Sequence, residues 1–238
     1  MTRLSVNVNK VALLRNSRGS NFPDLLKVAK DCEDFGAQGI TVHPRPDERH
    51  IRYSDVAPLK AQVRSEFNIE GYPSPDFMKL VLANRPHQCT LVPDSPDQLT
   101  SDHGWNTYAQ ADFLKDIIAQ LQAEGIRVSL FLDAEEKMVE GAKAVGADRI
   151  ELYTGDYAKA YEADRESAVA AHRSCAKLAD NIGLGVNAGH DLNLDNLAFY
   201  AREVQPLHEV SIGHALITDA IYLGLKNTIQ LYLRCLEK

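Results

Sequence analysis

Long apolar runs are absent from the sequence, and this absence limits where the protein can act. No stretch approaches the roughly 18 uninterrupted apolar residues that span a bilayer, and the opening MTRLSVNVNK lacks the apolar core of a signal peptide. We therefore expect no membrane contact and a cytoplasmic location. Basic residues are not in excess either, since 26 Lys and Arg stand against 33 Asp and Glu, for a net charge of −7. This balance argues against nucleic acid as a partner, so an anionic ligand would need a local cationic pocket.

Paired cysteines and metal-binding motifs are also missing. The four cysteines contain no CxxC pair, which favours reduced, buried thiols over disulfides or a metal site. No HxH or HExxH spacing occurs, so we expect no catalytic metal. No GxGxxG follows the first β-rich run, which argues against an open dinucleotide-binding sheet. The sequence gives no sign of a cofactor.

What the sequence does contain is a regular series of eight short β-rich runs. They recur about every 30 residues, which is the length of one βα unit. The runs cover residues 4–8, 39–43, 67–71, 88–92, 126–131, 148–153, 182–189 and 208–213.

Amphipathic stretches lie between these runs. In residues 111–121, for example, Phe113, Leu114, Ile117, Ile118 and Leu121 have the spacing of one buried helical stripe. Strict alternation of strands and helices predicts a parallel sheet. We therefore predict one (β/α)₈ TIM barrel with extra short helices, spanning residues 1–238 as a single domain. The predicted helices cover residues 24–35, 71–86, 111–121, 133–147, 164–183, 193–206 and the last 20 residues, within a final apolar stretch from Leu216.

Two of the strand-to-helix connections are longer than usual. One runs from Asn9 to Pro23, and the other runs from Pro93 to Ala109. In a barrel both lie on the carboxyl-end face, where active sites are built. The second connection is a candidate lid; the alternative is a tolerated surface insertion.

Polar or turn-forming groups follow seven of the eight predicted strands. In chain order they are Asn7 and Asn9, His43 and Arg45, Glu70, Asp133, Glu151, Asn187 and His190, and Gly213 and His214. Surface charges placed at random would be spread over both ends of the barrel. This convergence on one end indicates an enzyme.

Two loops with small residues suggest a phosphate site. The sequence GHD follows the seventh strand and GHA follows the eighth, where barrels commonly hold phosphate against glycine N–H groups and a helix N-terminus. The alternative is a pair of ordinary turns. The segment from His43 to Arg52 holds two histidines and three arginines around two prolines, and it predicts a second anion site with Arg45 and His50 as contacts.

Two carboxylates lie in apolar strand contexts, Glu70 in NIEGY and Glu151 in RIELY. Burial there would raise the pKa of each carboxyl group and suit it to proton transfer. A structural salt bridge is the alternative for either one alone.

The sequence resembles the pyridoxine 5'-phosphate synthase family along essentially its whole length. The segments that carry the resemblance are NVNKVALLRNSRG, GITVHPRPDERHI, NIEGY, CTLVPD, IELYTGDYA, VNAGHDL and HEVSIGHALI. The resemblance implies a cofactor-free condensation of 3-amino-2-oxopropyl phosphate with 1-deoxy-D-xylulose 5-phosphate, and a homo-octamer. Pyridoxine 5'-phosphate, inorganic phosphate and water would be the products.

The resemblance also implies a role for each matching residue. His43 and Glu70 would accept protons, His190 would donate one, and Glu151 would assist near the transition state. The predicted contacts to the aminoketone phosphate are Asn7, Arg18, Asp191, Gly213 and His214, and those to the deoxyxylulose phosphate are Asn9, Lys10, Arg45, His50 and Thr100. Many members of the family have Asp-His at positions 9 and 10 and Gly at position 191, so this chain departs from the pattern there.

Two rival functions fit the same residues. One is a non-catalytic barrel that binds phosphosugars. The other is a different barrel lyase or isomerase that handles phosphorylated substrates.

Overall fold

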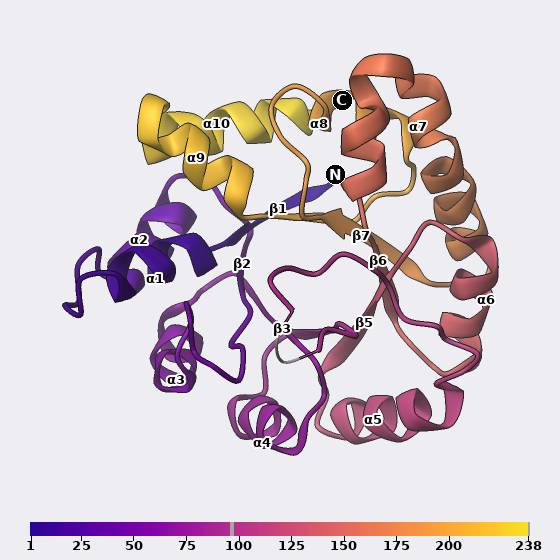
Figure 1. Ribbon diagram of the computed structural model, residues 1–238, viewed down its shortest axis with the longest axis horizontal. Helices are drawn as coiled ribbons and strands as arrows, with labels where there is room; N and C mark the ends of the chain where they lie inside the picture. The colour runs from indigo at the N-terminus through magenta and orange to yellow at the C-terminus, as the bar shows by residue number, and fades with distance from the viewer. Residues whose placement is uncertain (96–97, 238) are drawn as a thin grey trace.

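The computed structural model describes residues 1–95 and 98–237, and in it eight parallel strands close into a barrel in chain order (Figure 1). Closure is completed by β1, which pairs with β8 from Arg3 opposite Glu209 to Val6 opposite Ile212. All eight predicted strands are confirmed, and so is the barrel. The strands are β1 (Arg3–Asn7), β2 (Gly39–Val42), β3 (Glu66–Gly71), β4 (Gln88–Leu91), β5 (Arg127–Leu132), β6 (Arg149–Leu152), β7 (Gly185–Gly189) and β8 (Glu209–Ile212).

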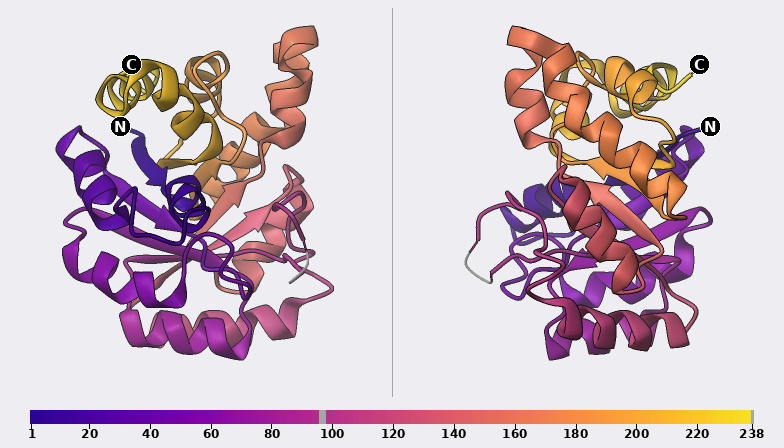
Figure 2. Two further views of the ribbon diagram at one scale, coloured as in Figure 1. Left: turned by 60° about the vertical axis from the view of Figure 1, so that its left-hand side comes forward. Right: turned by 90° about the vertical axis from the view of Figure 1, so that its right-hand side faces the viewer.

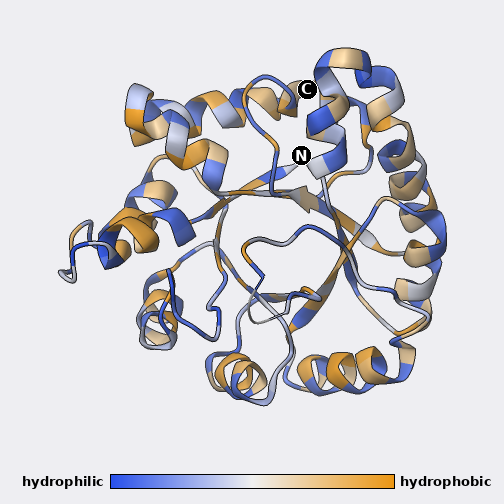
Figure 3. Ribbon diagram, in the orientation of Figure 1, coloured by the Kyte–Doolittle hydropathy of each residue, from blue (hydrophilic) through white to orange (hydrophobic). Residues whose placement is uncertain are grey.

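Helices form a ring outside the strands, and the views in Figure 2 show the same ring from the side. Hydrophobic and hydrophilic residues alternate along helices such as α4 and α5 (Figure 3), as the amphipathic pattern predicts. The helices are α1 (Asn9–Asn16), α2 (Leu25–Asp34), α3 (Tyr53–Gln62), α4 (Pro75–Asn84), α5 (Ala111–Ala123), α6 (Glu136–Ala144), α7 (Gly155–Asn181), α8 (Leu197–Glu203), α9 (His214–Leu223) and α10 (Leu225–Cys235). None of these described helices combines the length and apolarity needed to cross a membrane.

Most of the strands alternate apolar residues with polar or small ones, and the two sets have different neighbours. Apolar residues such as Ile40 and Val42 are fully buried in the layer between strands and helices. Polar side chains meet inside the barrel: the hydroxyls of Ser5 and Thr41 lie 2.7 Å apart, and Asn187 Nδ2 donates to Gln88 Oε1 from three strands away at 3.3 Å. The hydrophobic core is therefore a ring around a polar barrel interior.

Charged and imidazole groups fix the amino-terminal end of the barrel. Arg3 Nη1 pairs with Glu66 Oε2 at 2.7 Å. The imidazoles of His87 and His208 accept hydrogen bonds from the backbone N–H groups of Phe67 and Val186, at 3.0 and 3.1 Å. These two histidines have structural roles and lie at the end of the barrel opposite the predicted site.

Four helical segments differ from the sequence predictions. The connection predicted from Asn9 to Pro23 is helical in its first half, where α1 runs to Asn16. Helix α3 was not among the predicted stretches, and α7 begins at Gly155, earlier than predicted, with non-helical dihedral angles at Asp164. The final apolar stretch is divided at Gly224, whose φ of +77° ends α9 before α10 begins.

The second long connection is confirmed for its described residues, which contain no helix or strand between β4 and α5; positions 96–97 within it lie outside them. Its second half is packed on the barrel, since Trp105 is buried and its indole Nε1 donates to the carbonyl of Leu91 at 2.8 Å. Gly104 approaches β5 so closely that an added Cβ would lie 2.3 Å from the backbone N of Asp133. Because Gly104 and Trp105 are packed against the barrel, the segment from Gln98 to His103 is the part of this connection that can lie over the carboxyl end of the barrel.

Candidate active site

Glu70 reaches into the carboxyl end of the barrel from β3. Its carboxylate lies 3.4 Å from Asn7 Nδ2, 3.4 Å from Asn68 Nδ2 and 3.5 Å from Ser211 Oγ, so three strands surround it. Burial is the largest cause that raises the pKa of Glu70 to about 8, followed by repulsion from the carboxylate of Glu209. At neutral pH this group therefore holds a proton that it can exchange.

Glu151 lies across the interior on β6 and is almost fully buried, with 4% of its surface exposed. Its Oε2 has no hydrogen-bond partner among the described residues. Burial, and after it repulsion from Glu70, raises the pKa of Glu151 well above its ordinary value. A buried carboxyl group with one unpaired oxygen is more stable in its neutral form, so Glu151 is suited to donate a proton or a hydrogen bond.

His43 directly follows β2 and so lies at the carboxyl end of the barrel, as Glu70 does. Its backbone N–H donates to Asn9 Oδ1 at 2.9 Å, which ties the start of α1 to the end of β2. Its ring packs edge-on against His50, with the ring centroids 6.3 Å apart. Burial, and then the charge of Arg45, lowers the pKa of His43 well below its usual range. The ring is thus neutral at pH 7 and free to accept a proton.

His50 is held by a hydrogen bond from the backbone N–H of Ile51 to its Nδ1, at 2.9 Å. Burial lowers its pKa to about 4, and the charges of Arg45 and Lys10 add to the effect. Lys10 on α1 is thus near enough to His50 for its positive charge to disfavour protonation of the imidazole. The two positions predicted to contact one phosphate therefore lie on the same side of the site.

His190 is the residue after β7, and its backbone has a left-handed φ of +66°. Its Nε2 lies 2.8 Å from the hydroxyl of Thr100, and its Nδ1 lies 2.6 Å from Asp191 Oδ2. The ring of Tyr153 packs edge-on against it at 5.8 Å. Tyr153 also lines a groove of about 710 Å³, whose other lining residues include Tyr157 and His172 of α7. The segment that carries Thr100 therefore reaches the predicted proton donor directly.

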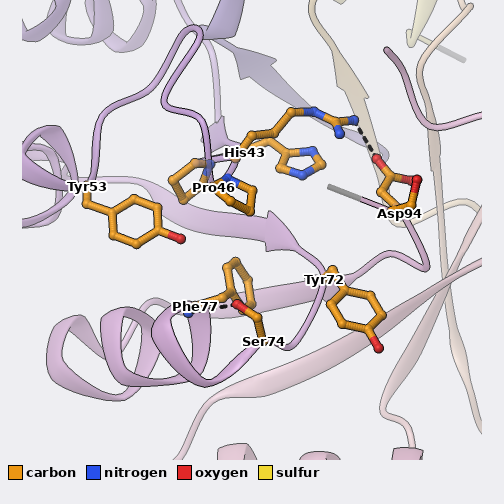
Figure 4. A pocket seen from close by; sticks show the side chains of 10 residues that line it. His43, Pro46, Tyr53, Tyr72, Ser74, Phe77 and Asp94 are labelled. Atoms are coloured by element: carbon orange, nitrogen blue, oxygen red, sulfur yellow. Dashed lines mark hydrogen bonds and ion pairs between the residues drawn. The ribbon is translucent and has the colours of Figure 1, made fainter. Parts of the chain in front are cut away.

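Arg45 is buried, and its Nη2 lies 2.5 Å from Asp94 Oδ2. Its Nη1 donates to the carbonyl of Gln98 at 3.0 Å, and Ser101 also donates to Asp94, at 2.7 Å. This ion pair borders a cavity of about 120 Å³ beside His43 (Figure 4). Arg45 thus connects β2 to the segment over the site, a role that its position in a basic loop did not predict.

The last two strands end in the predicted small-residue loops. Gly213 precedes the first residue of α9, His214, and an added Cβ on Gly213 would lie 3.1 Å from Asn7 Cβ. Glycine fits this close approach of β1 and the end of β8, where a larger residue would require Asn7 to shift by a few tenths of an ångström. Asn7 Oδ1 in turn accepts the backbone N–H of Asn9 at 3.0 Å.

The predicted residues are thus joined by contacts or by electrostatic effects, with one exception. Arg18 lies in the exposed turn that projects from the barrel between α1 and α2 (Figure 1). Within residues 1–95 and 98–237, no hydrogen bond or ion pair joins its side chain to the others. Its role at the aminoketone phosphate stays a prediction.

Sequence reasoning missed Asp94 and Tyr153. Asp94 follows β4, the one strand for which no polar group was assigned, so the same strand-end argument could have found it. Tyr153 ends the sixth run, and only the fold shows that its ring meets His190. In the part of the chain that the structure describes, no group of three His, Cys, Asp or Glu residues is arranged to hold a metal ion.

Two histidines and two buried carboxyl groups, whose pKa values burial raises, lie at the carboxyl end of this closed barrel, an arrangement typical of (β/α)₈-barrel enzymes that work by proton transfer. The chain matches the family model for "Pyridoxal phosphate biosynthesis protein PdxJ" over residues 4–238. It is 59% identical over 237 residues to the pyridoxine 5'-phosphate synthase of Parabacteroides distasonis and 58% identical to that of Bacteroides fragilis, with 100% of each chain covered. The chain belongs to this family.

A solved structure from another family shows the same fold. The 3-keto-L-gulonate-6-phosphate decarboxylase of Vibrio cholerae matches with a TM-score of 0.66 at 7% identity, over 99% of this chain and 97% of the other. At that identity the likeness concerns the fold alone.

Proposed function

We propose that this site carries out the reaction of a pyridoxine 5'-phosphate synthase, joining 3-amino-2-oxopropyl phosphate to 1-deoxy-D-xylulose 5-phosphate. The observation that carries the proposal is that His43, Glu70 and Glu151 are gathered at one barrel opening, where burial raises the pKa of both carboxyl groups and lowers that of His43, which leaves the imidazole unprotonated. Relatives of this name match the whole chain. Condensation of an amine with a ketone, loss of phosphate and ring closure are all steps that move protons.

In this proposal His43 and Glu70 accept protons, His190 donates one, and Glu151 assists near the transition state. The neutral imidazole of His43 supports its role as acceptor. Glu70 becomes an acceptor in the fraction of molecules in which it is ionised, and Glu151 supplies a hydrogen bond from its neutral carboxyl group.

Substrate phosphates bind at two places in the proposal. Gly213, His214 and Asn7 border the N-terminus of α9, which favours negative charge, and we assign the aminoketone phosphate to this end. Lys10 and His50 form the second place, to which we assign the deoxyxylulose phosphate. Arg45 would join that contact by sharing its guanidinium between the substrate and Asp94.

We further propose one domain, a homo-octamer and a cytoplasmic location. Pairing of β1 with β8 joins the two ends of the chain, which supports one domain. Leu14, Phe22, Ile221 and Tyr222 are exposed by 61 to 84%, and contact between α1 and α9 supports a shared subunit interface there. Sedimentation of the purified protein tests the assembly; a monomer at micromolar concentration would contradict it.

The experiment that tests the activity is incubation of the purified protein with both substrates, followed by mass spectrometry and phosphate assay. We expect pyridoxine 5'-phosphate and one inorganic phosphate per turnover, and loss of both in His43→Gln. The matched control is His87→Gln at the opposite end of the barrel, which should keep full turnover.

The rival functions predict different results. Binding of either substrate without turnover in a folded sample would indicate a phosphosugar-binding protein. Deuterium exchange into one substrate added alone, with no condensation product when both are present, would indicate a lyase or isomerase. Either result would reject the synthase.

A further inference from the structure

His190 has a backbone conformation that few residues with a side chain adopt. A φ of +66° costs roughly 1 kcal/mol or more in a residue with a Cβ. The backbone holds it there, because the N–H of His190 donates to the carbonyl of Ser211 at 3.2 Å. The strain fixes the direction in which the imidazole leaves the chain, so the ring is preorganised before any substrate arrives.

Three contacts fix the ring itself. Asp191 Oδ2 lies 2.6 Å from Nδ1, the Thr100 hydroxyl lies 2.8 Å from Nε2, and the Tyr153 ring packs edge-on at 5.8 Å. A carboxylate can only accept a hydrogen bond, so Nδ1 must carry a hydrogen. The Thr100 hydroxyl can accept from a protonated Nε2 or donate to a neutral one. Nε2 is therefore the nitrogen that gains and loses the proton.

The backbone N–H of Asp191 is already engaged. It lies 3.0 Å from the carbonyl of Gly189 and 3.3 Å from the hydroxyl of Thr154. Its carbonyl accepts from Asn196 Nδ2 at 3.3 Å. The main chain at this position thus has no free N–H to offer a phosphate.

The side chain of Asp191 is equally unsuited to bind an anion. Burial acts to raise its pKa, but the hydrogen bond and charge of His190, together with Lys159 and His214, lower it overall. The group is a carboxylate at neutral pH and repels phosphate. The carboxylate lies 2.6 Å from Nδ1 of His190, where it accepts a charge-assisted hydrogen bond from the ring when the ring is protonated.

We propose that Asp191 is a positioning residue for His190 and not a ligand of the substrate phosphate. It holds the hydrogen on Nδ1, points Nε2 at the substrate, and stabilises the imidazolium. This inference rests on the proposed role of His190 as proton donor. In the step, the Nε2–H bond breaks, the proton goes to the departing oxygen, and the electron pair stays on Nε2. The ring ends neutral, and Asp191 remains a carboxylate throughout.

Other charged or titratable groups also face this pair. His43 on β2, Tyr153 on β6, Lys159 on α7 and His214 on α9 all act electrically on His190 or Asp191. Asp191 is hydrogen-bonded to the ring of His190, and among the described residues none of these four groups is. Changing Asp191 should therefore have an effect that removal of a nearby unbonded charge does not reproduce.

The first test compares Asp191→Asn and Asp191→Gly with the control Asp156→Asn, which removes a nearby exposed carboxylate paired with Lys159. Both Asp191 variants should lower kcat on the order of 10- to 100-fold, with KM for the aminoketone phosphate unchanged or lower. The alkaline limb of their kcat profile should move to lower pH. The control should match the parent protein.

Two outcomes would overturn the inference. One is a raised KM for the aminoketone phosphate with unchanged kcat and pH profile, which a phosphate ligand would give. The other is an equal shift of the pH profile in Asp156→Asn, which would show that any nearby carboxylate suffices.

A second readout separates this inference from the proposed activity. Nitrogen-15 NMR of the histidine rings, with His190 assigned by its absence in His190→Gln, reports which ring nitrogen carries hydrogen. We expect the Nδ1–H form in the parent protein and its loss in Asp191→Gly, whether or not the protein turns over substrate. An Nε2–H form in the parent protein would refute the positioning role even if the synthase reaction is observed.

Discussion

Glu70 gives the sharpest prediction, because its proton is held by burial and by the neighbouring Glu209. With a pKa of about 8, roughly one molecule in ten carries the ionised form at pH 7, and nearly all do at pH 9. If Glu70 accepts a proton in the reaction, kcat/KM should rise about tenfold per unit up to about pH 8. Glu70→Gln should reduce kcat by at least about 100-fold.

The same group makes a second, independent prediction about stability. Its pKa in the folded protein lies above the ordinary value of 4.5, so the folded state keeps a proton that the unfolded state loses between about pH 4.5 and 8. The free energy of unfolding should therefore fall as pH rises through that window, by up to about 1.4 kcal/mol per unit. Glu70→Gln cannot ionise and should gain stability relative to the parent protein as pH rises.

The assays are steady-state kinetics and urea denaturation, each from pH 5 to 9. The control is Glu140→Gln on the exposed face of α6, which should follow the parent protein in both. A kcat/KM that is flat from pH 6 to 8, together with equal pH dependence of stability in Glu70→Gln and the parent, would refute the reasoning.

Three further predictions concern other contacts. Arg15→Ala should lower the free energy of unfolding by about 3–5 kcal/mol, measured by urea denaturation. The buried Arg15 donates two hydrogen bonds to Asp55, at 2.7 and 2.8 Å, and the substitution removes both. Unchanged stability would contradict this. Glu151→Gln resembles the neutral carboxyl group in shape, so the melting temperature should stay equal or rise. Glutamine cannot transfer a proton, so kcat should fall. A large loss of stability would show that Glu151 is ionised. Gly104→Ala places a Cβ 2.3 Å from the backbone N of Asp133, so the segment should move away from the barrel and expose Trp105. Trp105 is the one tryptophan in the sequence, so a red shift of the fluorescence emission would report its exposure. An unchanged spectrum would count against the close packing.

The barrel could be predicted from the sequence because its signal is local. Most strands alternate polar or small residues with apolar ones, and each unit repeats at about 30 residues, so eight strands and their order are visible without any long-range contact. The first helix was missed because α1 leaves Leu13 and Leu14 exposed, which blurs the single apolar stripe expected of a buried helix.

The candidate site could be predicted only in part. Parallel strands place their carboxyl ends together, so positions such as His43, Glu70 and Glu151 follow from strand order alone. What strand order cannot supply is the pairing between loops. The bonds from Arg45 to Asp94 and from Thr100 to His190 join segments 49 and 90 residues apart, and they depend on how the loops fold over the barrel.

The alternation within each strand has a consequence for how the family can vary. Odd positions of β1, such as Ser5, meet other polar groups in the lumen, while even positions, such as Leu4 and Val6, hold the helices in place. One set of residues in a strand therefore faces the barrel interior, and the other set packs against the helices. A residue that faces the interior can be exchanged without repacking the layer between strands and helices. Inserting a single residue within a strand would swap the two sets beyond that point, so we expect the barrel to tolerate length changes in its loops and not in its strands.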